Sequence, residues 1–136
     1  MCNNSLIYMI TPTTASVTSG GVLPLSTIAR RRGRSISSET DSVLLGAPGY
    51  YRVSANVTFT APVAGDVSIE LRNNGTPVAG VTSSTTITTA DTEVRSLTLS
   101  GIVRVPCCGG TATLSLVNTG VAIETSNISF DVEYLD

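Results

Sequence analysis

The sequence predicts an all-β fold in one domain, an antiparallel sandwich or barrel. Segments that alternate apolar and polar residues recur at spacings of about a dozen residues, and this alternation is typical of strands with one buried face. β-Branched residues dominate the apolar set and Ser and Thr are abundant, which favours strands over helices. No segment of about ten or more residues keeps the helical period. At 136 residues the chain can bury one core.

The N-terminal segment predicts a short strand that needs cover on both faces. Five consecutive residues are apolar: Leu6, Ile7, Tyr8, Met9 and Ile10. In water such a strand would be an aggregation hazard. We therefore expect residues 1–15 to form an apolar strand or arm and residues 16–136 to form the sandwich domain. The same five residues are predicted to contact another subunit.

The next two segments lack a strong strand signal. Residues 16–28 hold short apolar pieces broken by Gly20, Gly21 and Pro24, and we interpret them as an edge strand with loops. Residues 30–42 form the most polar segment of the chain. They predict a loop, or a short outer strand at Ser35 and Ile36.

The clearest strand is predicted over residues 50–60. The Ala47-Pro48-Gly49 sequence before it is typical of a turn, because Pro fixes φ and Gly tolerates a positive φ. One face of the strand is predicted to be buried, and it carries Tyr51, Val53, Ala55, Val57 and Phe59.

Two hairpins of one design are predicted after this strand. Residues 66–72 alternate, and Asn74-Gly75 is the centre of a type I′ turn before a return strand over about residues 76–81. Residues 82–92 form a Ser/Thr-rich tract of low complexity. Residues 111–123 repeat the pattern of strand, Asn-x-Gly turn and short apolar piece, so a second hairpin is expected there.

Two further strands complete the prediction. Residues 93–105 place Leu97, Leu99, Gly101, Val103 and Val105 on one face. Ile102 falls on the opposite face, and we expect it to contact another subunit. The last strand is predicted over residues 127–134, with Ile128, Phe130, Val132 and Tyr134 facing inward.

The order of these motifs is similar to that of C1q/TNF-like domains. Gly-Gly-Val-Leu-Pro-Leu at residues 20–25, Pro-Gly-x-Tyr-x-Val at residues 48–53, Asn-Gly-Thr at residues 74–76 and Leu-x-Leu-x-Asn at residues 114–118 carry the resemblance, which extends from about Ser16 to Leu135. The chain is most similar to the compact bacterial and bacteriophage versions. The resemblance implies an antiparallel jelly-roll β-sandwich and a homotrimer that displays a receptor-binding or structural surface.

The composition argues against an enzyme. His and Lys are absent, so a serine nucleophile has no side-chain base of the usual kind. We expect no catalytic residue, no cofactor and no metal. One alternative stays open, a calcium ion held by Asp131 and Glu133 together with Asp66 or Glu70.

The three cysteines do not form a recognisable site. Cys2, Cys107 and Cys108 are an odd number, and adjacent cysteines rarely bridge each other. We expect reduced thiols; the alternative is a cross-link from Cys107 or Cys108 to Cys2 or to another subunit.

Arg30, Arg31, Arg32 and Arg34 form the one conspicuous charge cluster. They form either a solvated loop, paired with Glu39, Asp41 or Asp136, or a docking patch for an acidic surface such as a capsid shell, an anionic glycan or nucleic acid. Nucleic acid is disfavoured because the net charge is −2 and aromatic residues are scarce.

The function hypothesis that these features favour is a trimeric, non-enzymatic bacteriophage virion component. It would be a head fibre, a capsid decoration or a tail-associated protein, made in the host cytoplasm, with host surface glycans among its candidate partners. No secretory signal is recognisable, and no apolar run reaches the roughly 18 residues that a membrane-spanning helix needs. The alternatives are a C1q/TNF-like signalling ligand and a bacterial spore or cell-surface binding module; the latter usually carries a Gly-x-y stalk, and this sequence has none.

Overall fold

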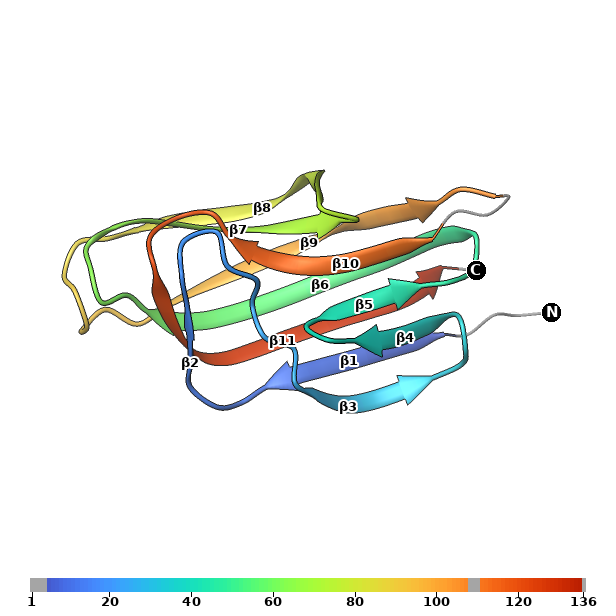
Figure 1. Cartoon of the computed structure of the whole chain (residues 1–136), viewed down its shortest axis with the longest axis horizontal. Helices are drawn as coiled ribbons and strands as arrows, with labels where there is room; N and C mark the ends of the chain where they lie inside the picture. Colours follow the sequence, from blue (N-terminus) through green and yellow to red (C-terminus); the bar gives the residue numbers. More distant parts are fainter. Residues whose placement is uncertain (1–4, 108–110, 136) are drawn as a thin grey trace.

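The computed structural model describes residues 5–107 and 111–135 and confirms the all-β prediction. These residues form eleven strands and no helix, and the strands lie in two antiparallel sheets packed face to face (Figure 1).

The two sheets have six and five strands. In the six-stranded sheet the neighbours are, in order, β3 (Thr27–Arg32), β1 (Leu6–Thr11), β11 (Ile123–Leu135), β6 (Gly49–Thr60) and β9 (Arg95–Val105), and β2 (Ala15–Val17) also pairs with β11. In the five-stranded sheet they are β4 (Ile36–Glu39), β5 (Ser42–Leu45), β10 (Ala112–Asn118), β7 (Gly65–Asn73) and β8 (Thr76–Ile87).

The first predicted hairpin is confirmed. Asn74 and Gly75 have φ values of 52° and 84°, as a type I′ turn requires, and they join β7 to β8. β8 continues to Ile87, beyond the predicted end at residue 81. Its Ser/Thr-rich part pairs with β7 up to the Gly65–Ile87 pair, because β-branched Thr suits an edge strand.

The second predicted hairpin is wrong, because β10 and β11 lie in different sheets. The turn between them carries the chain across the sandwich. Buried Asn118 holds this turn: its side-chain amide donates to the Val121 carbonyl at 2.8 Å, and its oxygen accepts from the Gly120 N–H at 3.0 Å. The same local turn sequence therefore serves a crossover as well as a hairpin.

The loop prediction for the polar segment at residues 30–42 is also partly wrong. Arg30, Arg31 and Arg32 belong to β3, which pairs with β1 at the edge of the six-stranded sheet, and β4 begins at Ile36. An edge strand that is exposed on both faces does not need to alternate, so its sequence gives no period-two signal.

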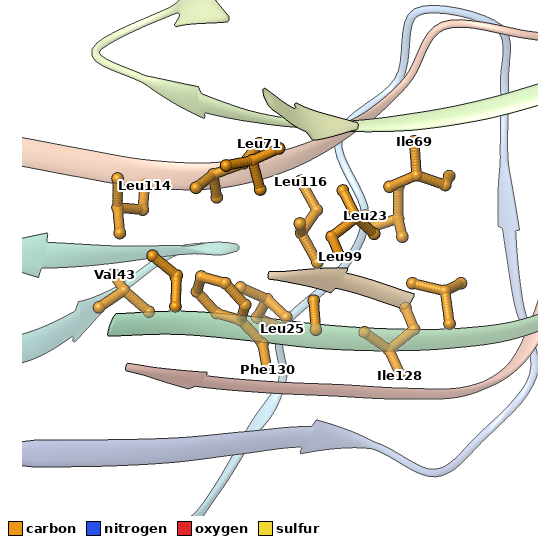
Figure 2. Packing of buried hydrophobic residues seen from close by; sticks show 14 of the residues in the cluster. Leu23, Leu25, Val43, Ile69, Leu71, Leu99, Leu114, Leu116, Ile128 and Phe130 are labelled. Carbon is orange, nitrogen blue, oxygen red and sulfur yellow. The ribbon is translucent and has the colours of Figure 1, made fainter. Parts of the chain in front are cut away.

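The core fills the space between the two sheets (Figure 2). Every side chain predicted to face inward from β6 is at most 4% exposed, and Phe130 of β11 is 1% exposed. The leucines and isoleucines of β7 and β10 face them from the other sheet. Burial of each large apolar side chain stabilises the fold by about 1.5–3 kcal/mol.

A corner of interlocking aromatic rings explains the Pro-Gly-x-Tyr motif. The Tyr51 ring meets the Tyr134 ring edge to face, with centroids 5.1 Å apart, and the Tyr51 hydroxyl donates to the Ala47 carbonyl at 2.6 Å. Gly49 has a φ of 138°, and a Cβ there would lie 2.7 Å from the Tyr134 ring. Gly49 is therefore required both by its backbone conformation and by the close ring.

Candidate interaction surface

The outer face of the six-stranded sheet, the face that points away from the core, carries exposed apolar side chains. Tyr8, Tyr50 and Ile102 are 38%, 53% and 55% exposed there. Exposed apolar groups scattered singly are ordinary, whereas a set that shares one face with charged residues often marks an interaction site.

The ladder register places these residues in rows across the sheet, because residues paired across strands point to the same face. One row runs from the β3 edge to the β9 edge through Arg32, Leu6, Glu133, Arg52 and Ile102. The adjacent row contains Arg30, Tyr8, Asp131, Ser54 and Ser100.

The structure divides the residues predicted to contact another subunit. Leu6, Tyr8 and Ile10 of β1 lie on the outer face, as Ile102 does. The prediction is wrong for Ile7 and Met9, which are 0% and 2% exposed and point into the core. The apolar run of β1 is explained by a strand whose inner face lies on the core of its own subunit and whose outer face is half covered.

The outer face is hollowed beside β1. A hollow of about 350 Å³ is lined by Leu6, Tyr8, Arg30, Asp131 and Glu133, together with parts of Ile7 and Val132. A second hollow of about 150 Å³ adjoins it and is lined by Ser5, Leu6, Arg32, Glu133 and Tyr134. We call the two hollows together the trough. Leu6 and Tyr8 lie along its middle, with Arg30 and Arg32 on one side and Asp131 and Glu133 on the other.

The part of the same face over β6 and β9 carries a cationic and apolar group, which we call the knob. It consists of Tyr50, Arg52, Ile102 and Arg104, in which Tyr50 pairs with Arg104 and Arg52 pairs with Ile102. Arg52 and Glu133 approach to 3.8 Å, but their side chains are 61% and 51% exposed. Such a pair contributes little to stability.

Sequence reasoning did not identify Tyr50, Arg52 or Arg104 as interface residues. Each alternates with an inward residue, which shows only that it points outward. The alternation of β9 does place Arg104 on the same face as Ile102, two residues away. The proximity of Tyr50 and Arg52 to Ile102 follows from the register between β6 and β9, and single-strand patterns do not contain that information.

The arginine cluster lies at the β3 edge. Arg30 and Arg32 are paired with Tyr8 and Leu6 and so share the outer face, Arg31 is paired with inward-pointing Ile7, and Arg34 follows in the bend before β4. All four are exposed. The ion pairs seen within residues 5–107 and 111–135 use other arginines.

The partners expected for a solvated arginine loop are engaged elsewhere or lie outside the described residues. Asp41 accepts a hydrogen bond from the Leu25 N–H at 3.2 Å. Glu39 forms no ion pair with the cluster in the described part of the chain. Asp136 lies outside the described residues.

The calcium alternative is wrong in the form stated above. Asp131 and Glu133 lie on the outer face of the six-stranded sheet, whereas Asp66 and Glu70 alternate with buried residues on β7 and lie on the outer face of the other sheet. The whole sandwich separates the two pairs. Among the described residues, no three His, Cys, Asp or Glu side chains are grouped so as to hold a metal ion.

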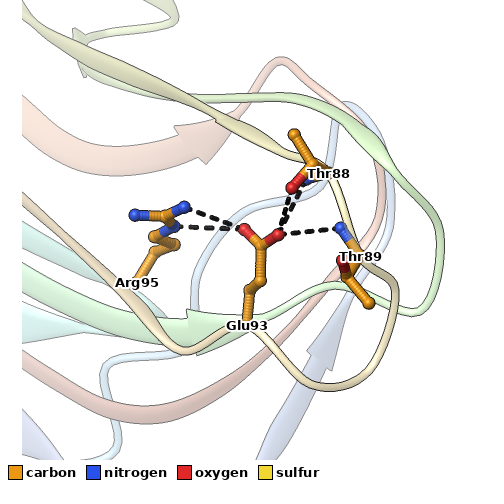
Figure 3. A network of polar contacts seen from close by, with 4 residues as sticks. All are labelled: Thr88, Thr89, Glu93 and Arg95. Atoms are coloured by element: carbon orange, nitrogen blue, oxygen red, sulfur yellow. Dashed lines mark hydrogen bonds and ion pairs between the residues drawn. The ribbon is translucent and has the colours of Figure 1, made fainter.

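Glu93 is the described carboxylate with a strongly shifted pKa (Figure 3). It accepts hydrogen bonds from the Thr88 hydroxyl, from the Thr88 and Thr89 N–H groups at 3.2 and 2.8 Å, and from Arg95 at 2.9 Å. The Thr88 hydroxyl and then Arg95 lower the pKa of Glu93 from 4.5 to about 2. At neutral pH Glu93 is therefore an anion that holds the loop between β8 and β9, and so low a pKa does not suit general acid–base catalysis near neutral pH.

The cysteine predictions stay largely untested. Cys107 is exposed, whereas Cys2 and Cys108 lie outside the described residues. A search of the described residues for a helix able to cross a membrane finds none.

Comparison with known proteins places the fold. No protein-family model matches the chain, and no curated protein matches its sequence. Solved structures do match. Eiger TNF from S. frugiperda gives a TM-score of 0.76 at 11% identity, covering 98% of this chain and 92% of its own.

Two other structures match over nearly the whole chain. The globular domain of zebrafish complement 1qA protein gives a TM-score of 0.71 at 8% identity, covering 97% of this chain and 98% of its own. The PRD1 vertex protein P5 gives 0.65 at 14% identity, with both chains fully covered. These likenesses confirm the predicted C1q/TNF-like jelly-roll fold.

Proposed function

We propose that this protein is a non-enzymatic display or structural module that works as a homotrimer, assembled through the outer face of the six-stranded sheet. The observation that carries the proposal is the exposed apolar set on that face, above all Ile102 and Tyr8. Burial of a Leu or Ile side chain is worth about 1.5–3 kcal/mol, so covering these groups favours association. The number of copies follows the C1q/TNF-like domains, which are typically homotrimers.

The knob and the trough suit a ring. A closed ring of three copies uses heterologous contacts, in which one patch of each copy meets a different patch of the next. Here the knob carries Arg52 and Arg104 around Ile102, and the trough carries Asp131 and Glu133 beside Tyr8. The carboxylate side of the trough is therefore complementary to the arginines of the knob, while Arg30 and Arg32 line the other side of the trough.

The composition of the chain and the environment of Glu93 support a non-enzymatic role. The sequence has no His and no Lys, and the most strongly shifted described carboxylate is tied into a loop. The neighbours in fold are a TNF, a complement protein and a vertex protein.

Within this class we propose a virion component, a head fibre, capsid decoration or tail-associated protein. The full-length likeness to the PRD1 vertex protein P5 supports this assignment. The likeness to Eiger TNF and to the complement domain supports a second candidate, a C1q/TNF-like ligand or a bacterial spore or cell-surface binding module. Labelling the protein with antibody on purified particles would distinguish a virion component from a free ligand.

The trimer is tested by placing a charge on the knob. We expect Ile102→Asp to convert a trimer at micromolar concentration into monomers that keep the β-type circular dichroism spectrum. Val94→Asp is the matched control, because Val94 is 65% exposed but lies in the loop before β9, away from the knob. Sedimentation velocity showing a wild-type monomer, or equal effects of the two substitutions, would contradict the proposal.

A mixing experiment tests the ring geometry. Ile102→Asp breaks the knob, and Tyr8→Asp breaks the trough. In a heterologous ring, the two defective proteins retain one intact contact between them, so an equimolar mixture should form a heterodimer. If the contact instead joins identical patches, one of the two substituted proteins keeps its patch and should still associate with itself, and the mixture should contain no heterodimer.

A further inference from the structure

A basic corner lies where the chain leaves the six-stranded sheet and enters the other one. It consists of Arg30, Arg31, Arg32 and Arg34, which we call the basic corner. The backbone beneath it is fixed: the Ser35 N–H donates to the Ser5 hydroxyl at 3.1 Å, and the Gly46 N–H donates to the Ser35 carbonyl at 2.8 Å. Arg34 is thus carried on an anchored turn, next to Arg30, Arg31 and Arg32 on β3.

The corner concentrates half of the positive charge of the chain. The remaining residues hold four arginines against ten acidic residues. Like charges placed side by side oppose folding, and the described residues offer these four arginines no ion pair in return. The cluster is therefore better explained by a contact outside the subunit than by folding.

We propose that the basic corner docks a short, acidic, extended segment of a partner protein. A guanidinium group binds a carboxylate through two parallel hydrogen bonds, so Arg31 and Arg34, the two arginines outside the trough, select Asp and Glu side chains. The acidic remainder of the chain repels a long polyanion but leaves room for a short segment that contacts only the corner. This inference goes beyond the proposed trimer, and it relies on Arg31 and Arg34 because the trimer contact covers the trough that Arg30 and Arg32 line.

The competing explanation is protection of the sheet edge. Charged residues and bulges on an edge strand prevent edge-to-edge pairing with other chains. β3 carries three charged arginines, and its register with β1 shifts between Tyr8 and Met9, as at a bulge. The Arg30 side chain also donates to the Ala29 carbonyl of the edge strand at 3.0 Å. Edge protection needs positive charge but no acidic partner, so a measurement of acidic-peptide binding to the basic corner distinguishes the two explanations.

Arg31 and Arg34 allow a test that spares the trimer. Arg30 and Arg32 line the trough, whereas Arg31 pairs with inward-pointing Ile7 and Arg34 lies beyond the strand. The test variant is Arg31→Ser/Arg34→Ser. The control is Val63→Asp/Val94→Asp, which lowers the net charge by the same two units at exposed loop positions outside the knob, the trough and the basic corner.

The probe is a fluorescent peptide of alternating Glu and Ser, with a Lys and Ser peptide as its charge-reversed control. Fluorescence anisotropy should show binding of the acidic peptide, weakened by the test variant about threefold to thirtyfold and nearly unchanged by the control. Binding should also fall as salt rises, because exposed charges are screened beyond about 8 Å at physiological ionic strength. Sedimentation should show that the test variant keeps the oligomeric state of the wild type.

Three results would overturn the proposal. The first is acidic-peptide binding that is absent or equal in the test variant and the wild type. The second is tighter arginine-dependent binding of single-stranded oligothymidylate or heparin, which would identify a site for long polyanions. The third is fibre formation by the variant with all four arginines replaced by Ser, without peptide binding by the wild type, which would leave edge protection as the role of the corner.

Discussion

Replacing Tyr51 tests the buried corner at two levels of severity. Tyr51→Phe keeps the ring against Tyr134 but removes the hydroxyl that donates to the Ala47 carbonyl at 2.6 Å. Tyr51→Ala removes the ring as well and leaves a cavity beside Tyr134. Phe59→Ala is the matched control, since Phe59 is also 0% exposed on the same face of β6 but has no hydroxyl.

The expected magnitudes differ enough to be resolved. A hydrogen bond contributes about 0.5–1.5 kcal/mol net, so Tyr51→Phe should lower the free energy of unfolding by about 1 kcal/mol. Loss of a buried aromatic ring costs about 3–5 kcal/mol, so Tyr51→Ala and Phe59→Ala should each lower it by that amount.

Urea denaturation at one fixed protein concentration is the appropriate assay, because subunit association makes the apparent stability concentration-dependent. A loss below about 1 kcal/mol for Tyr51→Ala would refute the assignment of this ring to the core. Equal losses for Tyr51→Phe and Tyr51→Ala would instead show that the hydroxyl, and not the ring, carries the stabilisation.

The same residue predicts an alkaline transition. Burial raises the pKa of Tyr51 above the ordinary value of 10.0; the hydrogen bond to Ala47 lowers it and Tyr134 raises it, both to a smaller extent. The fold therefore favours the neutral phenol. Its contribution is complete below pH 10 and is lost as the pH rises through the pKa of the folded state. Tyr51→Phe should flatten the fall in stability above pH 10, measured by urea denaturation, and an unchanged slope would contradict this.

Three further predictions concern single sites. Glu93→Ala should speed hydrogen exchange of the Thr88 amide at neutral pH, because it removes the acceptor of that N–H. In the wild type, the stability that the Glu93 carboxylate contributes is complete above pH 4.5 and is lost as the pH falls towards 2. Protection of the Thr88 amide against exchange should therefore be greater at pH 3 than at pH 2. Gly49→Ala should lower the unfolding free energy by about 2–4 kcal/mol, because the new Cβ meets Tyr134 and φ is positive; an unchanged Tm would contradict the predicted clash. Asn118→Asp should destabilise the protein more than Asn118→Ala, because it buries a charge and replaces the amide donor with an acceptor. A higher urea midpoint for Asn118→Asp than for Asn118→Ala would show that the crossover turn does not need that donor.

The faces of the strands could be predicted from the sequence because one core imposes one alternation. Tyr51, Phe59 and Phe130 are buried as the period of two required, and Ile102 is exposed as its departure from that period indicated. The face on which a side chain lies depends on its position relative to the residues before and after it in the strand, and the sequence gives those positions directly.

Pairing could not be predicted in the same way. The turn at Asn118 resembles the hairpin turn at Asn74, yet one joins two sheets and the other joins two neighbours. The strand that follows the turn, and the sheet in which that strand pairs, decide whether a hairpin or a crossover forms, so tertiary contacts override a similar local signal.

The candidate surface shows the same division. The sequence identifies Tyr8 as an interface candidate, Arg30 as part of the charge cluster, and Asp131 and Glu133 as candidate calcium ligands. Their meeting around one trough requires β1 to lie between β3 and β11, which is a property of the whole topology.

The position of β11 has a consequence for biosynthesis. β11 is hydrogen-bonded to β1 on one side and β6 on the other, so the first strand of the chain waits for the last one before the six-stranded sheet can form. During translation, β1 and β6 would expose their apolar inner faces until residues 123–135 leave the ribosome. Non-local pairing of this kind slows folding, and unpaired strand edges invite aggregation in the interval. The nascent chain is therefore expected to need protection from aggregation until residues 123–135 have emerged, and its association with other copies must follow that step.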